Sequence, residues 1–416
     1  MKFTKTEKSW ILYDWANSAY SIVTVTAILP IYFKSIAHAD GVANATATAY
    51  WGYANSVGTL IISLLAPLLG AIADYQSYKK KLFNFFNIIA IISTLLLVFV
   101  PARAWLLLLV VFVISTVGYA GANIFYDGFL TDVTSTARMD RVSAQGYSMG
   151  YLGGVIPFVL IMLLQLTRGF GFLDSTGIVN FGFIMTTIWW LIFSVPLMLN
   201  VSQTHYLTPV PHIIRTSWRR VTRTFKTVWR DKYIVWFLAA YFFYIDGVDT
   251  IFKMATSVGA DYGLSTTSLM LVLLMVQLIA VPFSVLFGHL ANRIGNKRSI
   301  GIAIFIYLVI CIWGYFMKSE LDFWILAFLV GTSQGGIQAL SRSHYAKIIP
   351  SEKANEYFGI YNIFGKFSAI IGPALFGIFA QLTGATKYGI LSIILLFIVG
   401  GLLFIKVPSD RVSAIK

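Results

Sequence analysis

Long apolar segments follow one another along almost the whole chain, separated by short polar breaks. Each segment holds about the 20 residues that a helix needs to cross the hydrocarbon core of a bilayer. Only 12% of the 416 residues are charged, whereas soluble domains average about 25%. The sequence therefore predicts an all-α integral membrane protein and argues against the alternative of a very large soluble helical protein.

The apolar windows predict twelve membrane-spanning helices. They lie at residues 9–36, 48–73, 82–101, 104–127, 143–166, 181–200, 232–256, 264–290, 299–317, 322–346, 355–382 and 386–405. An even number of spans places both termini on the same side of the membrane.

The basic residues support this count, because Lys and Arg concentrate in the cytoplasmic loops of membrane proteins. Most of the 31 Lys and Arg residues fall in every second break, the set that includes both ends of the chain. The alternate breaks hold only Lys34, Arg103, Arg168, Lys253, Lys318 and Lys387, and Lys366 lies within a span. We therefore expect a multi-pass protein with both termini in the cytoplasm.

The net charge of +14 would also suit a protein that binds nucleic acid. Because most basic residues belong to the cytoplasmic breaks, anionic lipid headgroups account for the charge, and no nucleic-acid partner is expected. The single cysteine, Cys311, lies in an apolar span, and the five histidines are scattered. We therefore expect no disulfide, no metal site and no cofactor.

The longest cytoplasmic break predicts a linker between two halves. Within it, apolar residues recur at helical spacing at Ile214, Trp218, Val221, Phe225 and Val228, and basic residues line another face at Arg215, Arg219, Arg223, Lys226 and Arg230. Such an amphipathic helix is suited to the membrane interface, and binding to a calmodulin-like protein is the alternative. The predicted units are residues 1–200, a linker at 201–231, and residues 232–416.

Two short loops resemble each other in the two halves. GAIADYQSYKK begins at Gly70 and holds Asp74, Lys79 and Lys80, and GHLANRIGNKR begins at Gly288 and holds Asn292, Arg293, Gly295, Lys297 and Arg298. A repeated loop predicts two six-helix halves related by an internal repeat, as in many secondary transporters.

Both loops are similar to the signature of the major facilitator superfamily, roughly G-x-x-x-D-R-x-G-R-K. The first copy keeps Gly70 and Asp74 but has Tyr75 at the Arg position, and the second has Asn292 at the Asp position. The resemblance implies that this loop stabilises one conformation through charge pairs and a neighbouring helix N-terminus. The missing carboxylate of the second copy argues against equal locks in both halves.

A narrower resemblance rests on five stretches spread over the chain. They are YDWANSAY (13–20), GYSMGYLGG (146–154), YFFYIDGVDT (241–250), GGIQALSRSHYAKIIP (335–350) and FGIYNIFGKFSAIIGP (358–373). They resemble the vacuolar amino-acid effluxers linked to autophagy and their bacterial relatives. The eukaryotic members imply efflux of neutral amino acids, and the compact loops imply a bacterial-type plasma membrane.

Polar residues within the first span lie on one helix face. Asp14, Asn17, Ser21 and Thr24 follow at steps of three and four residues. This stripe could line a substrate path. Hydrogen bonding between helices, with Asp14 near the cytoplasmic rim, is the alternative.

Charged residues deep in the later spans should face protein or a water-filled cavity. Asp246 and Asp249 are the candidates for proton coupling, and an Asp249–Lys253 ion pair is the structural alternative. Lys366 lies close to the middle of its span, where it could bind a substrate carboxylate or pair with Asp246.

Two further polar groups lie in spans four and ten. Asn123 and Asp127 are four residues apart, as are Gln334, Gln338 and Arg342 in turn. The resemblance implies that spans one, four, seven and ten surround a central cavity. Asp127 and Arg342, near the cytoplasmic ends, are equally candidates for a gate.

These features together predict a secondary transporter that works by alternating access. Gradient-driven export of small polar solutes is favoured, with amino acids as the leading substrates, a proton as the possible coupling ion and a functional monomer. Alternatives are a proton-coupled exporter of drugs or other metabolites, and a receptor or channel with a transporter fold. The chain lacks a nucleotide-binding Gly–Lys–Ser/Thr loop and clustered catalytic residues, so we expect no enzyme.

Overall fold

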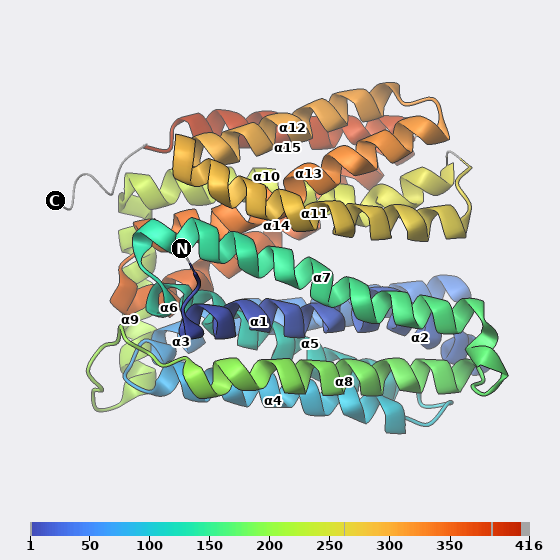
Figure 1. Ribbon diagram of the computed structural model, residues 1–416, viewed down its shortest axis with the longest axis horizontal. Helices are drawn as coiled ribbons and strands as arrows, with labels where there is room; N and C mark the ends of the chain where they lie inside the picture. The colour runs from blue at the N-terminus through green and yellow to red at the C-terminus, as the bar shows by residue number, and fades with distance from the viewer. Residues whose placement is uncertain (1, 262, 384–385, 409–416) are drawn as a thin grey trace.

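The computed structural model describes residues 2–261, 263–383 and 386–408. Within these residues the secondary structure is helical apart from one isolated bridge between Tyr75 and Leu207. Twelve helical segments are long and apolar enough to cross a membrane. The predicted all-α membrane fold with twelve spans is therefore confirmed, and Figure 1 shows the helices running side by side along one direction.

The first part of the chain, called the N-half below, extends from α1 to α8. Its helices are α1 (Lys5–Ala19), the π-helix η1 (Tyr20–Ile28), α2 (Leu29–Ala39), α3 (Asn44–Ala73), α4 (Tyr78–Leu96), α5 (Trp105–Gly128), α6 (Leu130–Val133), α7 (Met139–Leu166) and α8 (Ser175–Asn200). Short 3₁₀ turns follow at η2 (Leu97–Phe99), η3 (Thr136–Arg138) and η4 (Arg168–Gly171).

The second part, called the C-half, extends from α10 to α15. Its helices are α10 (Lys232–Asp261), α11 (Thr266–Ile294), α12 (Asn296–Phe316), α13 (Glu320–Ile348), α14 (Ala354–Thr383) and α15 (Thr386–Ile405), with the 3₁₀ turn η5 (Ser351–Lys353) before α14. The helix α9 (Ile213–Arg230) lies between the two halves in the sequence.

Several helices begin earlier than the apolar windows indicate. The fifth span begins at Met139 rather than 143, and the sixth at Ser175 rather than 181. Polar residues form these first turns, and the Asp174 side chain caps α8 by accepting the backbone N–H of Gly177 at 2.7 Å. Hydropathy alone misses them because a capped polar turn is as helical as an apolar one.

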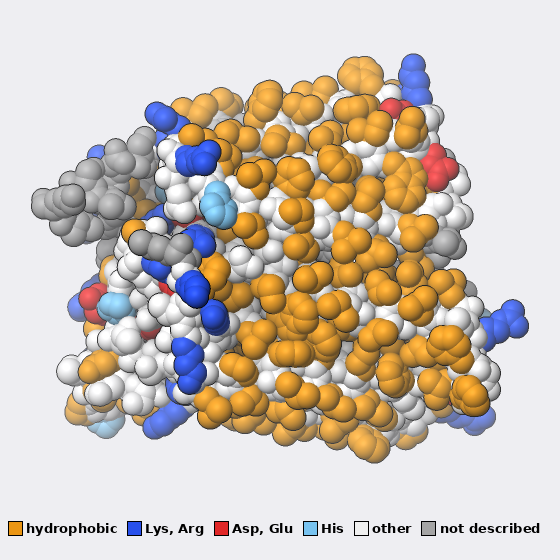
Figure 2. All heavy atoms as spheres, in the orientation of Figure 1, with side chains coloured by type: hydrophobic (Ala, Val, Ile, Leu, Met, Phe, Trp, Pro, Cys, Tyr) orange, Lys and Arg blue, Asp and Glu red, His pale blue; other side chains and the backbone are white. Residues whose placement is uncertain are grey.

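The two halves lie side by side with their helices roughly parallel (Figure 1). They meet chiefly along α7 with α11 and α3 with α14, and further contacts join α13 to α7 and α14 to α5. The start of α1, the end of α15 and α9 lie at one end of the bundle, which we call the terminal face; the other end is the opposite face. Figure 2 shows apolar side chains covering the middle of the bundle and most Lys and Arg side chains near the terminal face.

The linker forms the predicted helix, α9, which packs against α3 and α10. Its basic residues Arg215, Arg219, Arg223, Lys226 and Arg230 are exposed. The predicted apolar face is only partly correct, because Ile214 and Trp218 are 69% and 60% exposed. The buried face is rotated and consists of Ser217, Val221, Thr224 and Val228.

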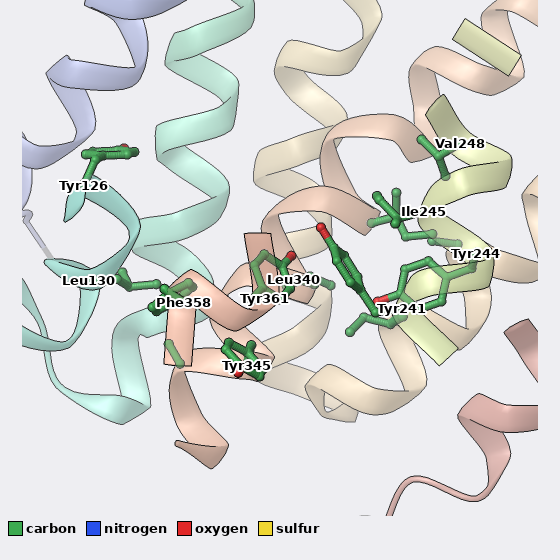
Figure 3. Packing of buried hydrophobic residues seen from close by; sticks show 14 of the residues in the cluster. Tyr126, Leu130, Tyr241, Tyr244, Ile245, Val248, Leu340, Tyr345, Phe358 and Tyr361 are labelled. Atoms are coloured by element: carbon green, nitrogen blue, oxygen red, sulfur yellow. The ribbon is translucent and has the colours of Figure 1, made fainter. Parts of the chain in front are cut away.

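One buried apolar cluster contains residues of both halves (Figure 3). Tyr126 and Leu130 belong to it from the N-half, and Phe358, Tyr345 and Tyr361 from the C-half. The rings of Tyr345 and Tyr361 stack with their centroids 4.9 Å apart. The two halves therefore share one buried apolar cluster in this conformation.

Candidate functional site

A cavity of about 370 Å³ lies between the two halves. Its walls come from α1, η1, α5 and α7 of the N-half and from α10, α11, α13 and α14 of the C-half. Seven of the predicted site residues line it: Asp14, Asn17, Asn123, Asp127, Gln338, Arg342 and Lys366. The four spans that the resemblance implied thus reach the cavity, together with three more helices.

The first span presents its polar stripe to this cavity only in part. Asn17 donates to Asn123 Oδ1 at 3.0 Å, and Ser21 also lines the cavity. Thr24 does not; it is fully buried, and Thr26 takes the cavity position instead. The prediction for Thr24 fails because η1 is a π-helix, whose wider turn rotates the later residues away from α-helical spacing.

Arg342 of α13 joins the C-half to three helices of the N-half. Its guanidinium lies 3.1 Å from Asp14 Oδ2 and 3.3 Å from Asp127 Oδ1. It also donates to the side-chain and backbone oxygens of Ser143, at 2.9 and 3.1 Å. Arg342 is 3% exposed, so a buried ion cluster closes the cavity toward the terminal face.

Aromatic rings surround the same guanidinium. The ring centroids of Trp10, Tyr126 and Tyr147 lie 4.7, 5.4 and 4.4 Å from its central carbon. Arg suits such a site because its planar group stacks on rings while donating to carboxylates at its edge. Trp10 and Tyr147 were not predicted from the sequence, where their only signal was their helical spacing with Asp14 and Ser143.

Lys366 is the cationic group of the cavity that is free to meet a ligand. No hydrogen bond or ion pair is assigned to its ammonium within the described ranges, although it interacts electrostatically with Asp249 and Asp127. The expected pairing with Asp246 is not formed. Asp246 instead accepts the backbone N–H of Gly372 at 2.9 Å.

The remaining predicted residues lie outside the cavity lining. Asp246 is fully buried between α10 and α14, and Asp249 is half-buried. Lys253 donates to the carbonyl of Ala369 at 2.8 Å rather than forming the alternative ion pair with Asp249. Gln334 is buried, and its Oε1 has no hydrogen-bond partner among the described residues.

The first signature loop joins the two halves at the terminal face. Asp74 Oδ1 accepts the backbone and side-chain N–H groups of Asn355, each at 2.9 Å, and Oδ2 accepts the N–H of Glu356 at 3.2 Å. These residues form the first turn of α14, whose unpaired N–H groups favour a carboxylate. Gly70 is required here, because a Cβ would lie 2.2 Å from the Asn355 carbonyl oxygen.

The arginine that this loop lacks is supplied by α9. Arg220 donates to Asp74 at 3.2 Å, to Glu356 at 2.8 Å and to the carbonyl of Ala71. Its guanidinium lies 4.9 Å from the ring centroid of Tyr75, the residue at the position of the signature Arg. Neither Arg220 nor Glu356 was identified from the sequence; the signals were the absent Arg and the surplus of Arg in the linker.

The end of the first loop packs within the N-half. Lys79 is fully buried, forming a 2.6 Å ion pair with Asp132 and donating to the Gly128 carbonyl at 3.2 Å. Lys80 is half-buried and forms no ion pair with the residues that the structure describes. Only the first of the two lysines therefore anchors the loop.

The second signature loop makes weaker contacts. Asn292, Arg293, Gly295 and Arg298 are exposed, and Lys297 donates to the carbonyls of Ile405 and Val407 at the end of α15. Gly288 and Asn296 of this loop lie at the contact between the halves: a Cβ on Gly288 would approach Ala144 Cβ to 2.6 Å, and Asn296 donates to Asp140.

A different carboxylate, Asp140 of α7, joins the halves on this side. It accepts from Asn296 at 2.7 Å and from Ser343 at 2.6 Å, and it pairs with Lys347. One side of the interface is therefore closed by Asp74 at the first turn of α14, and the other by Asp140 with side chains of α12 and α13.

The Asp74 contact predicts a pH-dependent closure of the terminal face. Burial raises the pKa of Asp74 from 3.8 to about 7, although Arg220 and Lys79 lower it in part. A raised pKa means that the closed face binds a proton more tightly than an open face, where Asp74 is exposed. Closure is therefore favoured most below pH 3.8 and loses this contribution as the pH rises through about 7.

We expect the closed fraction to fall between about pH 4 and pH 7, the window between the ordinary pKa of an exposed Asp74 and its raised pKa in the closed face. Fluorophores on the terminal ends of α3 and α14 would measure it by energy transfer. Asp74→Asn should flatten the curve. An unchanged slope in that variant would assign the pH dependence to another group.

Comparisons with known proteins agree with this geometry. Residues 4–414 match the family model described as vacuole effluxer Atg22 like. The chain is 47% identical to the uncharacterized MFS-type transporter YxiO of Bacillus subtilis, over 98% of this chain and 96% of that protein. It is 20% identical to autophagy-related protein 22 of Yarrowia lipolytica, over 86% and 75% of the two chains.

A solved structure supports the fold. The major facilitator superfamily proton:xylose symporter XylE superposes with a TM-score of 0.75 at 11% identity, covering 97% of this chain and 95% of that chain. The family match spans nearly all of the sequence, and the superposition extends over both halves. The chain therefore belongs to the Atg22-like vacuole effluxer family and is a transporter of the major facilitator superfamily, not an enzyme.

Proposed function

We propose that this transporter exports small polar solutes, with amino acids as the favoured class, by alternating access. The observation that carries the proposal is the polar cavity between the halves, which Arg342 closes at one end through Asp14 and Asp127. A carrier of this kind needs a central site that only one side of the membrane can reach at a time.

The terminal face is assigned to the cytoplasm of a bacterial-type cell. Most Lys and Arg side chains gather there, as the positive-inside rule requires (Figure 2). Residues 1–200 and 232–416 are the two moving units, and residues 201–231 connect them, with the basic face of α9 against anionic headgroups. The cavity is complete within one chain, which favours a functional monomer.

The cavity favours a small zwitterion. Its volume of about 370 Å³ lies near the lower end of the roughly 300–1,000 Å³ typical of ligand pockets. The ammonium of Lys366 is available for a substrate carboxylate. When the terminal face opens, Arg342 leaves Asp14 and Asp127, and these carboxylates become available to a substrate ammonium.

A proton gradient is the proposed driving force, and Asp246 is the proposed coupling carboxylate. It is fully buried, and its Oδ2 has no hydrogen-bond partner in the described part of the chain. A carboxyl group in this position can hold a proton in one conformation and release it in the other.

Counterflow in liposomes tests the proposal. Purified protein is reconstituted into liposomes loaded with unlabelled amino acids, and entry of labelled amino acids is measured. Lys366→Gln should lower substrate affinity roughly 10- to 100-fold, the cost of losing one charged hydrogen bond. Arg293→Gln, an exposed cation at the terminal face, should not change it.

The other outcomes separate the alternatives. Counterflow of drugs or other metabolites but not of amino acids would favour a different exporter. Ion currents would indicate a channel. Binding without counterflow would indicate a receptor and overturn the proposed carrier.

A further inference from the structure

One helix of the C-half, α14, reaches three places that matter for transport. Its first turn holds Asp74 through Asn355 and Glu356. Lys366 lies in the cavity wall. Pro373 lies further along the same helix. The position of α14 therefore decides where both the terminal contact and the cavity ammonium lie.

Pro373 interrupts the hydrogen-bond ladder of α14. Proline has no backbone N–H, so the carbonyl of the residue four positions earlier, Ala369, loses its helical partner. Lys253 of α10 donates its ammonium to this carbonyl at 2.8 Å. The unpaired backbone group created by the proline is thus satisfied from the neighbouring helix.

Asp246 contacts the same interruption from the same face of α10, two turns before Lys253. Its Oδ1 accepts the N–H of Gly372 at 2.9 Å and the hydroxyl of Thr250 at 3.4 Å. The residue before the proline has to be glycine, because a Cβ on Gly372 would lie 2.5 Å from Oδ1 of Asp246. Asp246 of α10 therefore accepts the N–H of Gly372, and Lys253 of α10 donates to the carbonyl of Ala369. Both contacts hold the segment of α14 that precedes Pro373.

Three other helices at the contact between the halves also contain a proline. Pro67 lies in α3, Pro157 in α7 and Pro282 in α11. In the described residues, no side chain donates to the carbonyl that any of these prolines frees. Among these four prolines, only Pro373 therefore has a side chain of a neighbouring helix bound to the carbonyl that it frees.

We propose that Asp246 and Lys253 are positioning residues that hold α14 across its proline and so set the places of Lys366 and of the Asp74 contact. Asp246 is the site at which a proton acts on this hold. A proton bound at Oδ2 removes the charge of the carboxylate and weakens its bond to Gly372, because charged acceptors bind N–H groups more strongly.

Among the described residues, few charged groups lie near Asp246. Asp249 and Lys253 of α10 act on it directly. Lys366 of α14 and Tyr307 of α12 act on Asp249, and α15 presents Phe397 next to Gly247. The direction of the pH effect therefore depends on Asp246 itself. Protonation of Asp246 at low pH weakens its contact with α14, and deprotonation at high pH restores that contact.

Spin labels on α14 test this directly in the full chain. Cysteines replace Phe367 and Leu382, which are 40% and 82% exposed on either side of the proline, in a Cys311→Ser background. Their spacing along an unbroken helix is about 22 Å. The wild type should give one distance at high pH and a growing second population as the pH falls.

Asp246→Asn should enrich the second population about tenfold or more at high pH and remove its pH dependence. Asp249→Asn is the matched control, because its carboxylate makes no hydrogen bond to α14 within the described ranges, and it should keep the pH dependence. An unchanged distance distribution and pH profile in Asp246→Asn would overturn the proposal.

A double variant tests the role of Lys253. Lys253→Met should shift the distances less than Asp246→Asn does, because its contact is exposed while that of Asp246 is buried. Pro373→Ala restores an N–H for the Ala369 carbonyl, so it should abolish the effect of Lys253→Met. An equal shift with and without the proline would show that Lys253 acts elsewhere.

This inference rests on the proposed function only in taking the proton at Asp246 to be the ion that drives transport. The distance measurement needs no substrate. If the distances depend on pH through Asp246 but no counterflow is seen, the positioning role is kept and the exporter is rejected. If counterflow is seen but the distances do not depend on Asp246, the exporter is kept and the positioning role is rejected.

Discussion

Replacing Arg342 by Gln should open the terminal face. The substitution leaves Asp14 and Asp127, whose side chains are only 14% and 16% exposed, without the cation that pairs with both. Breaking a buried ion pair by removing one partner costs roughly 3–5 kcal/mol, which corresponds to at least about a hundredfold loss in the ratio of closed to open protein. Transport should fall with it, because closure toward this face is a step of every cycle.

The opening can be measured by thiol labelling. Ser18 lines the cavity, and Ser18→Cys in a Cys311→Ser background should react with an impermeant reagent from the terminal side only when that face is open. Arg342→Gln should label fast, and Arg293→Gln should label like the parent. Slow labelling of Arg342→Gln would contradict the closing role of the cluster.

Replacing Gly70 by Ala should open the same face by a different cause. The new Cβ would lie 2.2 Å from the carbonyl oxygen and 2.7 Å from the carbonyl carbon of Asn355. These are backbone atoms and cannot rotate away, so α3 and α14 must separate, and Asp74 loses its partners. We expect fast labelling at Ser18→Cys and a loss of transport comparable to that of Arg342→Gln.

The control for this substitution is Gly301→Ala, since a Cβ there meets nothing within 4 Å. Alanine is favoured over glycine in a helix by about 1 kcal/mol, so neither variant should fail for lack of helix stability. Normal transport and slow labelling of Gly70→Ala would show that this contact is not part of the closed state.

Salt concentration should distinguish the two substitutions, because Arg342→Gln removes a charge whereas Gly70→Ala adds a steric conflict. Shifting the salt concentration should change the labelling of Arg342→Gln, because exposed carboxylates are screened. It should leave Gly70→Ala unchanged, because a steric conflict does not depend on ions.

Some of the candidate site followed from the sequence because its signals are local. Hydropathy and loop charge gave twelve spans, since the membrane acts on each segment by itself. Helical spacing gave the cavity residues Asn17, Asn123 and Gln338, since residues three or four apart share a face. The spacing failed at Thr24 because it assumes α-helical turns, and η1 is a π-helix.

The partners of the charged groups came only from the tertiary structure. Arg342 meets Asp127 and Asp14 across 215 and 328 residues of chain, and Asp246 bonds to Gly372 rather than to Lys366. By itself the sequence determined how many helices cross the membrane, which loops are basic and, for Asn17, Asn123 and Gln338, which helix face meets the cavity. The packing of the halves decided which charges pair and that Arg220 of the linker replaces the missing signature arginine, because such contacts depend on how distant helices meet and not on the residues beside them.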